Sequence, residues 1–234
     1  MEPTIAKIEC WTTPARAYPE KRVGKAEVRR VTYKAGFYRC YGVNKYDLFQ
    51  LPHDAYITTL RIWGKAHSKT WMVDDPPHWW AMENLAKNSS GNVLVAGLGL
   101  GLVLHALAAN DKVKRIVVVE REPDVIKLIE PFLPKDSRRE IVLGDFHDFI
   151  NPEMTECFDW NHIIVDLWVT HSLKDGYRVL EKEVKPMARQ LSKKWPNASL
   201  VFHGFPMHMW VQATIESSLP RVVQQLSGRI DGVR

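Results

Sequence analysis

From residue 93 onward, short apolar runs alternate with stretches of helical spacing, and this pattern restricts the fold more than any other feature of the sequence. The apolar runs are nearly continuous in Val, Ile and Leu instead of alternating with polar residues. Such strands are buried on both faces, as in parallel sheets that carry helices on either side. The sequence therefore predicts an α/β fold with a doubly wound, mostly parallel Rossmann-like sheet. The predicted strands are VLVAGLG (93–99), RIVVVERE (115–122), REIVLGD (139–145), HIIVDLW (162–168) and ASLVFHGF (198–205).

The preceding part of the chain has a different character. Residues 1–73 contain short runs rich in β-branched and aromatic residues, separated by Gly, Asn, Pro and Asp, which predicts a small antiparallel sheet. We expect this β-rich N-terminal segment to precede a Rossmann-like domain over residues 74–234. A helix should open that domain, with Asp74 or Asp75 as the N-cap and a proline in its first turn.

Composition places the chain among ordinary globular proteins, with 45% hydrophobic and 25% charged residues. No run approaches the roughly 18 uninterrupted apolar residues of a membrane helix. The first residues lack the basic region and apolar stretch of a signal peptide. The three cysteines lie far apart and form no CxxC pair, which argues against a disulfide framework or a zinc knuckle. These features predict a cytoplasmic protein without a membrane partner.

The positive charge is concentrated near the N-terminus. Residues 1–92 hold 14 Lys and Arg against 9 Asp and Glu, whereas residues 93–234 hold 18 of each. Within residues 21–39 a basic cluster could attract a phosphate backbone, although a solvated strand surface with positive edges is the simpler alternative. The cluster consists of Lys21, Arg22, Lys25, Arg29, Arg30, Lys34 and Arg39, with Glu27 as its acidic member.

The first predicted Rossmann strand runs directly into a glycine turn, and a helix, LVLHALAAN, follows the turn. Because Gly97, Gly99 and Gly101 lack Cβ atoms, their backbone lets a ligand approach closely and can present N–H groups to it. A strand, a glycine turn and a helix in this order are the context of a nucleotide-type site. A turn with a purely structural role remains the alternative.

Polar side chains also end the next three predicted strands. Glu120 can accept both hydroxyls of a ribose, and Asp145 can reach an adenine amino group while Phe146 flanks the ring. Asp166 ends the fourth strand. Because right-handed crossovers bring the carboxyl ends of parallel strands to one edge, all these residues should face one crevice.

With these motifs in this order, the sequence resembles the class I S-adenosylmethionine-dependent methyltransferase superfamily, and most closely its spermidine synthase-like branch. The resemblance covers roughly residues 55–205, with WMVDDPPHWWAMENLA standing before VLVAGLGLG as in that branch. It implies S-adenosylmethionine as the cofactor. It also implies that Glu120 is the acidic ribose ligand, Asp145 the adenine contact and Asp166 the acidic residue of the fourth strand.

Two departures from the polyamine synthases direct the functional prediction. Their GGGDG-type turn is GLGLG here, with Leu100 at the acidic position, and Leu167, Trp168 and Val169 replace their DSxD-type continuation after the aspartate. A carboxylate-rich pocket for a polyamine is therefore not expected. We predict a methyltransferase with a small-molecule or nucleic-acid acceptor. Aminopropyl transfer, another nucleotide-type enzyme and a non-catalytic binding protein on this scaffold remain alternatives.

For the acceptor side, the sequence predicts Asp166 as the catalytic residue that orients or deprotonates the acceptor. Asp75, His78 and Trp168 are the predicted acceptor-binding residues, and Trp79 and Trp80 could form a wall over the acceptor. The string Asp75-Pro-Pro-His78 is similar to the DPPY-type motif of amino-methyltransferases, but it lies too close to the glycine turn, so a helix start is favoured.

No metal site is expected, because the nine histidines form no HExxH or close HxH pair. His203 and His208 follow the fifth strand and could line the crevice. Residues 206–234 are predicted to be largely helical instead of forming a terminal β-hairpin. A homo-oligomer contact is one way to cover the resulting sheet edge.

Overall fold

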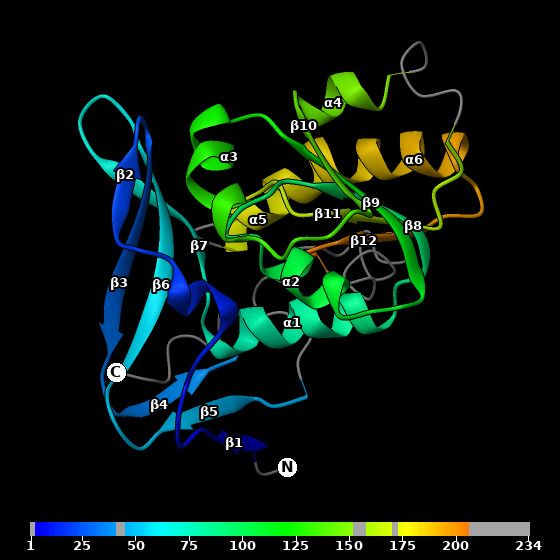
Figure 1. Cartoon of the computed structure of the whole chain (residues 1–234). Helices are drawn as coiled ribbons and strands as arrows, with labels where there is room; N and C mark the ends of the chain where they lie inside the picture. Colours follow the sequence, from blue (N-terminus) through cyan, green and yellow to red (C-terminus); the bar gives the residue numbers. More distant parts are fainter. Residues whose placement is uncertain (1–2, 41–44, 152–157, 170–172, 206–234) are drawn as a thin grey trace.

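The computed structural model describes residues 3–40, 45–151, 158–169 and 173–205, and the helix predicted within 206–234 lies outside these ranges. A parallel sheet with the strand order β10-β9-β8-β11-β12 forms the centre of the molecule (Figure 1). If these five strands are numbered along the chain, their order across the sheet is 3-2-1-4-5, and every pairing is parallel. The predicted α/β class and Rossmann-like sheet are confirmed. Its strands are β8 (Gly91–Ala96), β9 (Val113–Glu120), β10 (Arg139–Leu143), β11 (His162–Val165) and β12 (Ser199–Phe202).

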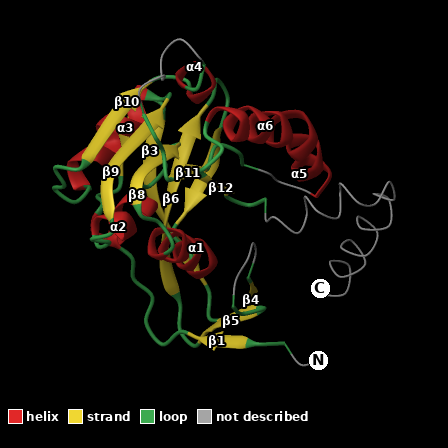
Figure 2. Ribbon diagram, turned by 90° about the vertical axis from the view of Figure 1, so that its right-hand side faces the viewer, coloured by secondary structure: helices red, strands yellow, loops and turns green. Residues whose placement is uncertain are grey.

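Helices cover both faces of this sheet, as the continuous apolar strands require (Figure 2). Val93 and Val95 of β8 pack into one core together with α1, α2 and α3. Leu94 and Ala96 point to the opposite face, into a second core that includes residues of α4 and α6. The elements are α1 (Pro76–Lys87), α2 (Leu102–Ala108), α3 (Pro123–Ile129), η2 (Glu130–Phe132), α4 (Phe146–Phe149), α5 (Leu173–Val179), the π-helical η4 (Leu180–Val184) and α6 (Lys185–Lys194).

The N-terminal residues form a four-stranded antiparallel sheet of order β2-β3-β6-β7, which confirms the predicted small antiparallel sheet. A second sheet, of order β1-β5-β4, was not predicted, and its β1 and β5 pair in parallel. Asp54 lies near the bend between β3 and β4, where its carboxylate accepts the Ala35 N–H and pairs with Lys34. The elements are β1 (Ile5–Lys7), η1 (Pro14–Ala17), β2 (Lys21–Val23), β3 (Ala26–Tyr33), β4 (Gly36–Arg39), β5 (Leu48–Leu51), β6 (Ala55–Trp63) and β7 (Ser68–Val73).

Buried polar contacts fix the antiparallel sheet against the start of the parallel one. The Asp74 carboxylate, 2% exposed, accepts the Thr13 hydroxyl at 2.5 Å and the Thr58 N–H at 2.6 Å. The Tyr18 hydroxyl donates to the Leu100 carbonyl at 2.9 Å, in the glycine turn. These contacts place the end of β7 and the start of α1 beside that turn.

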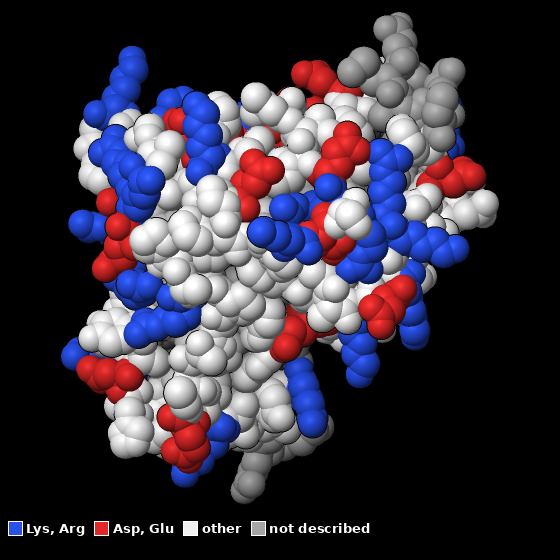
Figure 3. Space-filling model, viewed as in Figure 1, with Lys and Arg blue, Asp and Glu red and all other residues white. Residues whose placement is uncertain are grey.

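The basic cluster of residues 21–39 lies on and beside β2 and β3, where Lys and Arg side chains gather with acidic groups between them (Figure 3). Several of these cations already have partners. Arg29 pairs with Glu27 and Lys34 with Asp54, while the Arg22 guanidinium lies over the Trp63 ring. In the described ranges, no helix has both the length and the apolar composition to cross a membrane.

Candidate functional site

The strand order reverses between β8 and β11, and in open α/β sheets the ligand crevice lies at such a reversal, beyond the carboxyl ends of the strands. A cavity of about 600 Å³ lies there, within the usual range of roughly 300–1,000 Å³ for ligand sites. Nine of the ten site residues expected from the sequence line it, and Gly101 is the exception. The nine are Asp75, His78, Gly97, Gly99, Glu120, Asp145, Phe146, Asp166 and Trp168.

All three glycines of the turn have positive φ, at 92°, 52° and 68° for Gly97, Gly99 and Gly101. Side chains rarely adopt this backbone conformation. A Cβ atom on Gly97 would lie 2.5 Å from the Asp166 carbonyl oxygen, so this glycine allows β8 and β11 to end side by side. A Cβ on Gly101 would instead meet Leu133 at 2.3 Å, outside the cavity. Gly101 therefore serves packing and the start of α2.

Most amide groups of the turn are already used within the protein. The Leu98 N–H donates to the Glu120 carboxylate at 2.8 Å, and the Leu100 N–H donates to Met72 Sδ at 3.0 Å. The amides of Gly97 and Gly101 donate to backbone carbonyls. A ligand would therefore contact the backbone of this turn mainly by van der Waals packing and would receive few hydrogen bonds from its N–H groups.

Glu120 is the last residue of β9 and is only 6% exposed. Its carboxylate oxygens accept the Leu98 and Glu122 N–H groups, both at 2.8 Å. These two bonds hold the carboxylate against the wall of the cavity. Each oxygen of a carboxylate has two lone pairs, so acceptor capacity remains for a ligand hydroxyl.

Asp145 and Phe146 follow β10 and begin α4. Asp145 is the N-cap, and its carboxylate accepts the His147 N–H at 2.8 Å. Phe146 is 2% exposed and packs in the core on the α6 side while still lining the cavity. The strand thus ends before Asp145, not at it, because the aspartate begins a short helix.

At the other end of the cavity, Asp75 caps α1 as predicted. Its carboxylate accepts the His78 N–H at 3.4 Å, and Pro76 occupies the first helical position. The Tyr33 hydroxyl donates to the same carboxylate at 3.4 Å. Burial, followed by this neighbouring carboxylate, raises the pKa of Tyr33 to about 12. The helix start favoured from the sequence is confirmed.

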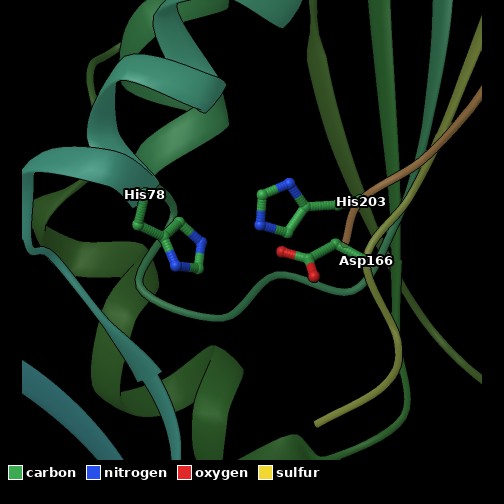
Figure 4. Close-up of side chains that lie close together, drawn as sticks. All are labelled: His78, Asp166 and His203. Atoms are coloured by element: carbon green, nitrogen blue, oxygen red, sulfur yellow. The ribbon is translucent and has the colours of Figure 1, made fainter. Parts of the chain in front are cut away.

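His78, Asp166 and His203 face one another across this end of the cavity (Figure 4). The two imidazole ring centroids are 4.8 Å apart. Burial, followed by the neighbouring His203, lowers the pKa of His78 to about 4, and Asp166 opposes the shift. His203 lines the cavity as anticipated, whereas His208 lies outside the described residues.

The tryptophans divide between the cavity and the core. Trp168 lines the cavity, donates from Nε1 to the Glu183 carboxylate at 2.5 Å and packs against Phe202 and Phe205. Trp79 packs against the core that includes α1, and Trp80 contacts Trp11 and Tyr46. The expectation that Trp79 and Trp80 form a wall over the acceptor is wrong, because neither residue lines the cavity.

Among the lining residues that sequence reasoning missed, Met72 and Glu183 shape the cavity most directly. Met72, on β7, lies against the turn, and a Cβ on Gly99 would meet its Sδ at 2.5 Å. Glu183, on η4, fixes the indole of Trp168. Met72 is the buried residue of KTWMV, between the partly buried Trp71 and Val73, and the sequence does not indicate what it covers.

The sequence matches no protein-family description and no curated protein. Solved structures share part of the fold. Precorrin-8W decarboxylase from Methanobacterium thermoautotrophicum is 18% identical, over 58% of this chain and 66% of its own, with a TM-score of 0.39. Human methyltransferase-like protein 13 in complex with SAH is 18% identical, over 50% of this chain and 60% of its own, with a TM-score of 0.37. Spermidine synthase from Thermotoga maritima is 17% identical, over 49% of this chain and 45% of its own, with a TM-score of 0.34.

The chain therefore spans less than two thirds of the length of each of these three structures. The fold assignment rests on the observed strand order and crevice. The fold is a doubly wound, Rossmann-like α/β fold. It positions the cavity so that the glycine turn and acidic residues lie at one end and the His78, Asp166 and His203 side chains at the other.

Proposed function

We propose that the cavity binds S-adenosylmethionine and that the chain transfers its methyl group to an acceptor. One observation carries this proposal: the residues expected for the ribose, the adenine and the acceptor all line the same cavity at the reversal of strand order. They come from the ends of four successive parallel strands and from the start of α1. A scaffold that served only as a binding surface would not require this convergence.

The residues present fit an adenosyl group. Gly97 and Gly99 line the cavity at the end of β8, and Glu120 holds a buried carboxylate at the end of β9, where a ribose diol would donate to it. Asp145 and Phe146 lie at the end of β10, where a carboxylate can accept from an adenine amino group and a ring can flank the base. A nicotinamide cofactor fits less well, because the turn amides are largely occupied.

When bound, S-adenosylmethionine supplies an electrophilic methyl group on a sulfonium, so the protein mainly has to align the acceptor and exclude water. Asp166 faces the cavity without a hydrogen bond to its carboxylate from any described residue, and it is placed to accept a proton or hydrogen bond from an acceptor. Trp168, held by Glu183, forms a rigid apolar wall beside it.

Aminopropyl transfer from decarboxylated S-adenosylmethionine is the second candidate, and one finding favours it. The sequence predicted no carboxylate-rich pocket, yet acidic residues outnumber cations among the described lining residues. Arg121 is the one Lys or Arg there. The excess of negative charge would favour a cationic acceptor. The acidic residues are Asp75, Glu120, Asp145, Asp166 and Glu183.

Calorimetric titration of the purified protein with S-adenosylhomocysteine and with decarboxylated S-adenosylmethionine tests the proposal and separates the two candidates. We expect micromolar binding of S-adenosylhomocysteine, abolished in Gly99→Trp. Gly64→Trp adds the same bulk at the exposed β6–β7 turn and is expected to bind as the wild type does. Tighter binding of the decarboxylated compound would favour aminopropyl transfer, and no binding of either would refute the cofactor site.

A further inference from the structure

We propose that His78, Asp166 and His203 form a binding site for a divalent transition-metal ion at the acceptor end of the cavity. Each residue offers one ligand atom, and these atoms all lie within 4.8 Å of one another. The three side chains come from α1, from the loop after β11 and from the loop after β12, and they converge on one point (Figure 4). Two imidazoles and one carboxylate are a common donor set for catalytic metals.

A second observation points to a missing ligand at the same place. His78 is 8% exposed, and its Nε2 atom is buried with no hydrogen-bond partner among the described residues. A buried polar atom without a hydrogen-bond partner destabilises the fold, so such an atom in a native structure calls for an explanation. The Asp166 carboxylate likewise accepts no hydrogen bond from a described residue, although it faces both rings. A metal ion would satisfy both groups together.

The backbone already holds the three residues in place. The Asp166 N–H donates to the Ala96 carbonyl at 3.0 Å, and the His203 N–H donates to the Val165 carbonyl at 2.8 Å. His78 lies in the first turn of α1, which Asp75 caps. Metal bonds of about 2.0–2.2 Å in tetrahedral geometry put ligand atoms roughly 3.3–3.6 Å apart. Side-chain rotations of the half-buried Asp166 and His203 can supply this contraction without moving the sheet.

The donor set also indicates which ions would bind. Imidazole nitrogens favour Zn²⁺, Fe²⁺ and Co²⁺ over Mg²⁺ and Ca²⁺, which prefer oxygen ligands. Three protein ligands leave at least one position open, and because all three residues line the cavity, that position faces it. An oxygen atom of a bound molecule could occupy it, and the ion would make a bound hydroxyl more acidic. That this molecule is the acceptor rests on the proposed function, whereas metal binding itself does not.

Metal binding can be measured directly on protein stripped with a chelator. Titration with Co²⁺, followed by visible absorption, and elemental analysis after dialysis against Zn²⁺ give affinity and stoichiometry. We expect one equivalent in the wild type, and at least a tenfold loss of affinity in His203→Gln and in Asp166→Asn. His147→Gln is the matched control, because His147 lines the cavity but is not part of the cluster, and it should bind as the wild type does.

Thermal unfolding separates loss of the site from loss of the fold. Zn²⁺ should raise the melting temperature of the wild type and of His147→Gln, but not that of His203→Gln or Asp166→Asn. No stoichiometric binding by the wild type, or equal binding by the cluster variants, would overturn the proposal. Titration of the metal-free protein with S-adenosylhomocysteine reports on the cofactor site independently, so failure of one proposal is distinguishable from failure of the other.

Discussion

Replacement of Glu120 by glutamine tests the proposed ribose contact together with the structure of the turn. The two carboxylate oxygens accept the Leu98 and Glu122 N–H groups, both at 2.8 Å. A glutamine side chain keeps one acceptor oxygen but carries an amide NH₂ in place of the other, so one buried N–H would face a donor. The variant therefore removes one bond within the protein and weakens the acceptor offered to a ligand.

The size of both effects follows from this geometry. A hydrogen bond to a charged group contributes about 1.5–3 kcal/mol, which is the expected loss in the free energy of unfolding. For a chain of this length each kcal/mol lowers the melting temperature by about 2–4 °C, so a fall of roughly 3–12 °C is expected. Loss of one ribose hydrogen bond of the same kind would weaken S-adenosylhomocysteine binding roughly 10- to 150-fold.

Differential scanning calorimetry and isothermal titration measure the two effects in one preparation. Glu140→Gln is the matched control, because Glu140 lies on the neighbouring β10 in an exposed ion pair with Arg115 and does not line the cavity. Such a pair contributes little, so this variant should unfold and bind as the wild type does. A folded Glu120→Gln protein that binds S-adenosylhomocysteine as tightly as Glu140→Gln would refute the ribose assignment.

Three further predictions concern the fold that supports the cavity. Tyr18→Phe removes the hydroxyl that donates to the Leu100 carbonyl of the glycine turn and lies 2.8 Å from His105 Nε2. The free energy of unfolding, measured in urea, should fall by about 1–3 kcal/mol. An unchanged urea midpoint would contradict a stabilising role for this hydroxyl. Burial lowers the pKa of His105 to about 4, whereas the unfolded chain takes up this proton below about pH 6.5, so stability should fall as the pH drops from about 6.5 to 4. His105→Gln should reduce this dependence in urea titrations at several pH values, and an identical dependence would contradict the reasoning. Gly97→Ala introduces a Cβ atom 2.5 Å from the Asp166 carbonyl oxygen at a φ of 92° and should lower the free energy of unfolding by more than about 2 kcal/mol. Gly144→Ala is the control, because nothing lies within 4 Å of the Cβ atom it introduces. Equal stability of the two variants would show that packing does not require glycine at position 97.

The sheet could be predicted because burial on both faces leaves a strong local pattern. Each predicted strand is present, and the polar residues at its end line the cavity, since parallel strands share one carboxyl edge. The strands themselves are shorter than predicted at that edge. Gly97 follows β8 with positive φ, and Asp145 is the N-cap of α4, so neither residue belongs to a strand. Local propensity marks such an end only to within a few residues.

Contacts between distant elements could not be predicted from the sequence. The bond from the Leu100 N–H to Met72 Sδ depends on how the antiparallel sheet packs on the turn, and no local pattern records this packing. The cluster of His78, Asp166 and His203 assembles from three elements, so it carries none of the close spacings by which metal sites are recognised. Trp80 was placed in the wrong environment because adjacent helical positions point in different directions.

Amide hydrogen exchange with and without saturating S-adenosylhomocysteine tests the central claim, that this cavity is an adenosyl-cofactor site, most directly. Slower exchange is expected in peptides that cover residues 97–101, 120–122 and 144–147, which adjoin the cofactor end of the cavity. Peptides from β2 and the start of β3 lie away from the cavity and should exchange at unchanged rates. Protection confined to other parts of the chain, or no protection at a saturating ligand concentration, would contradict the claim.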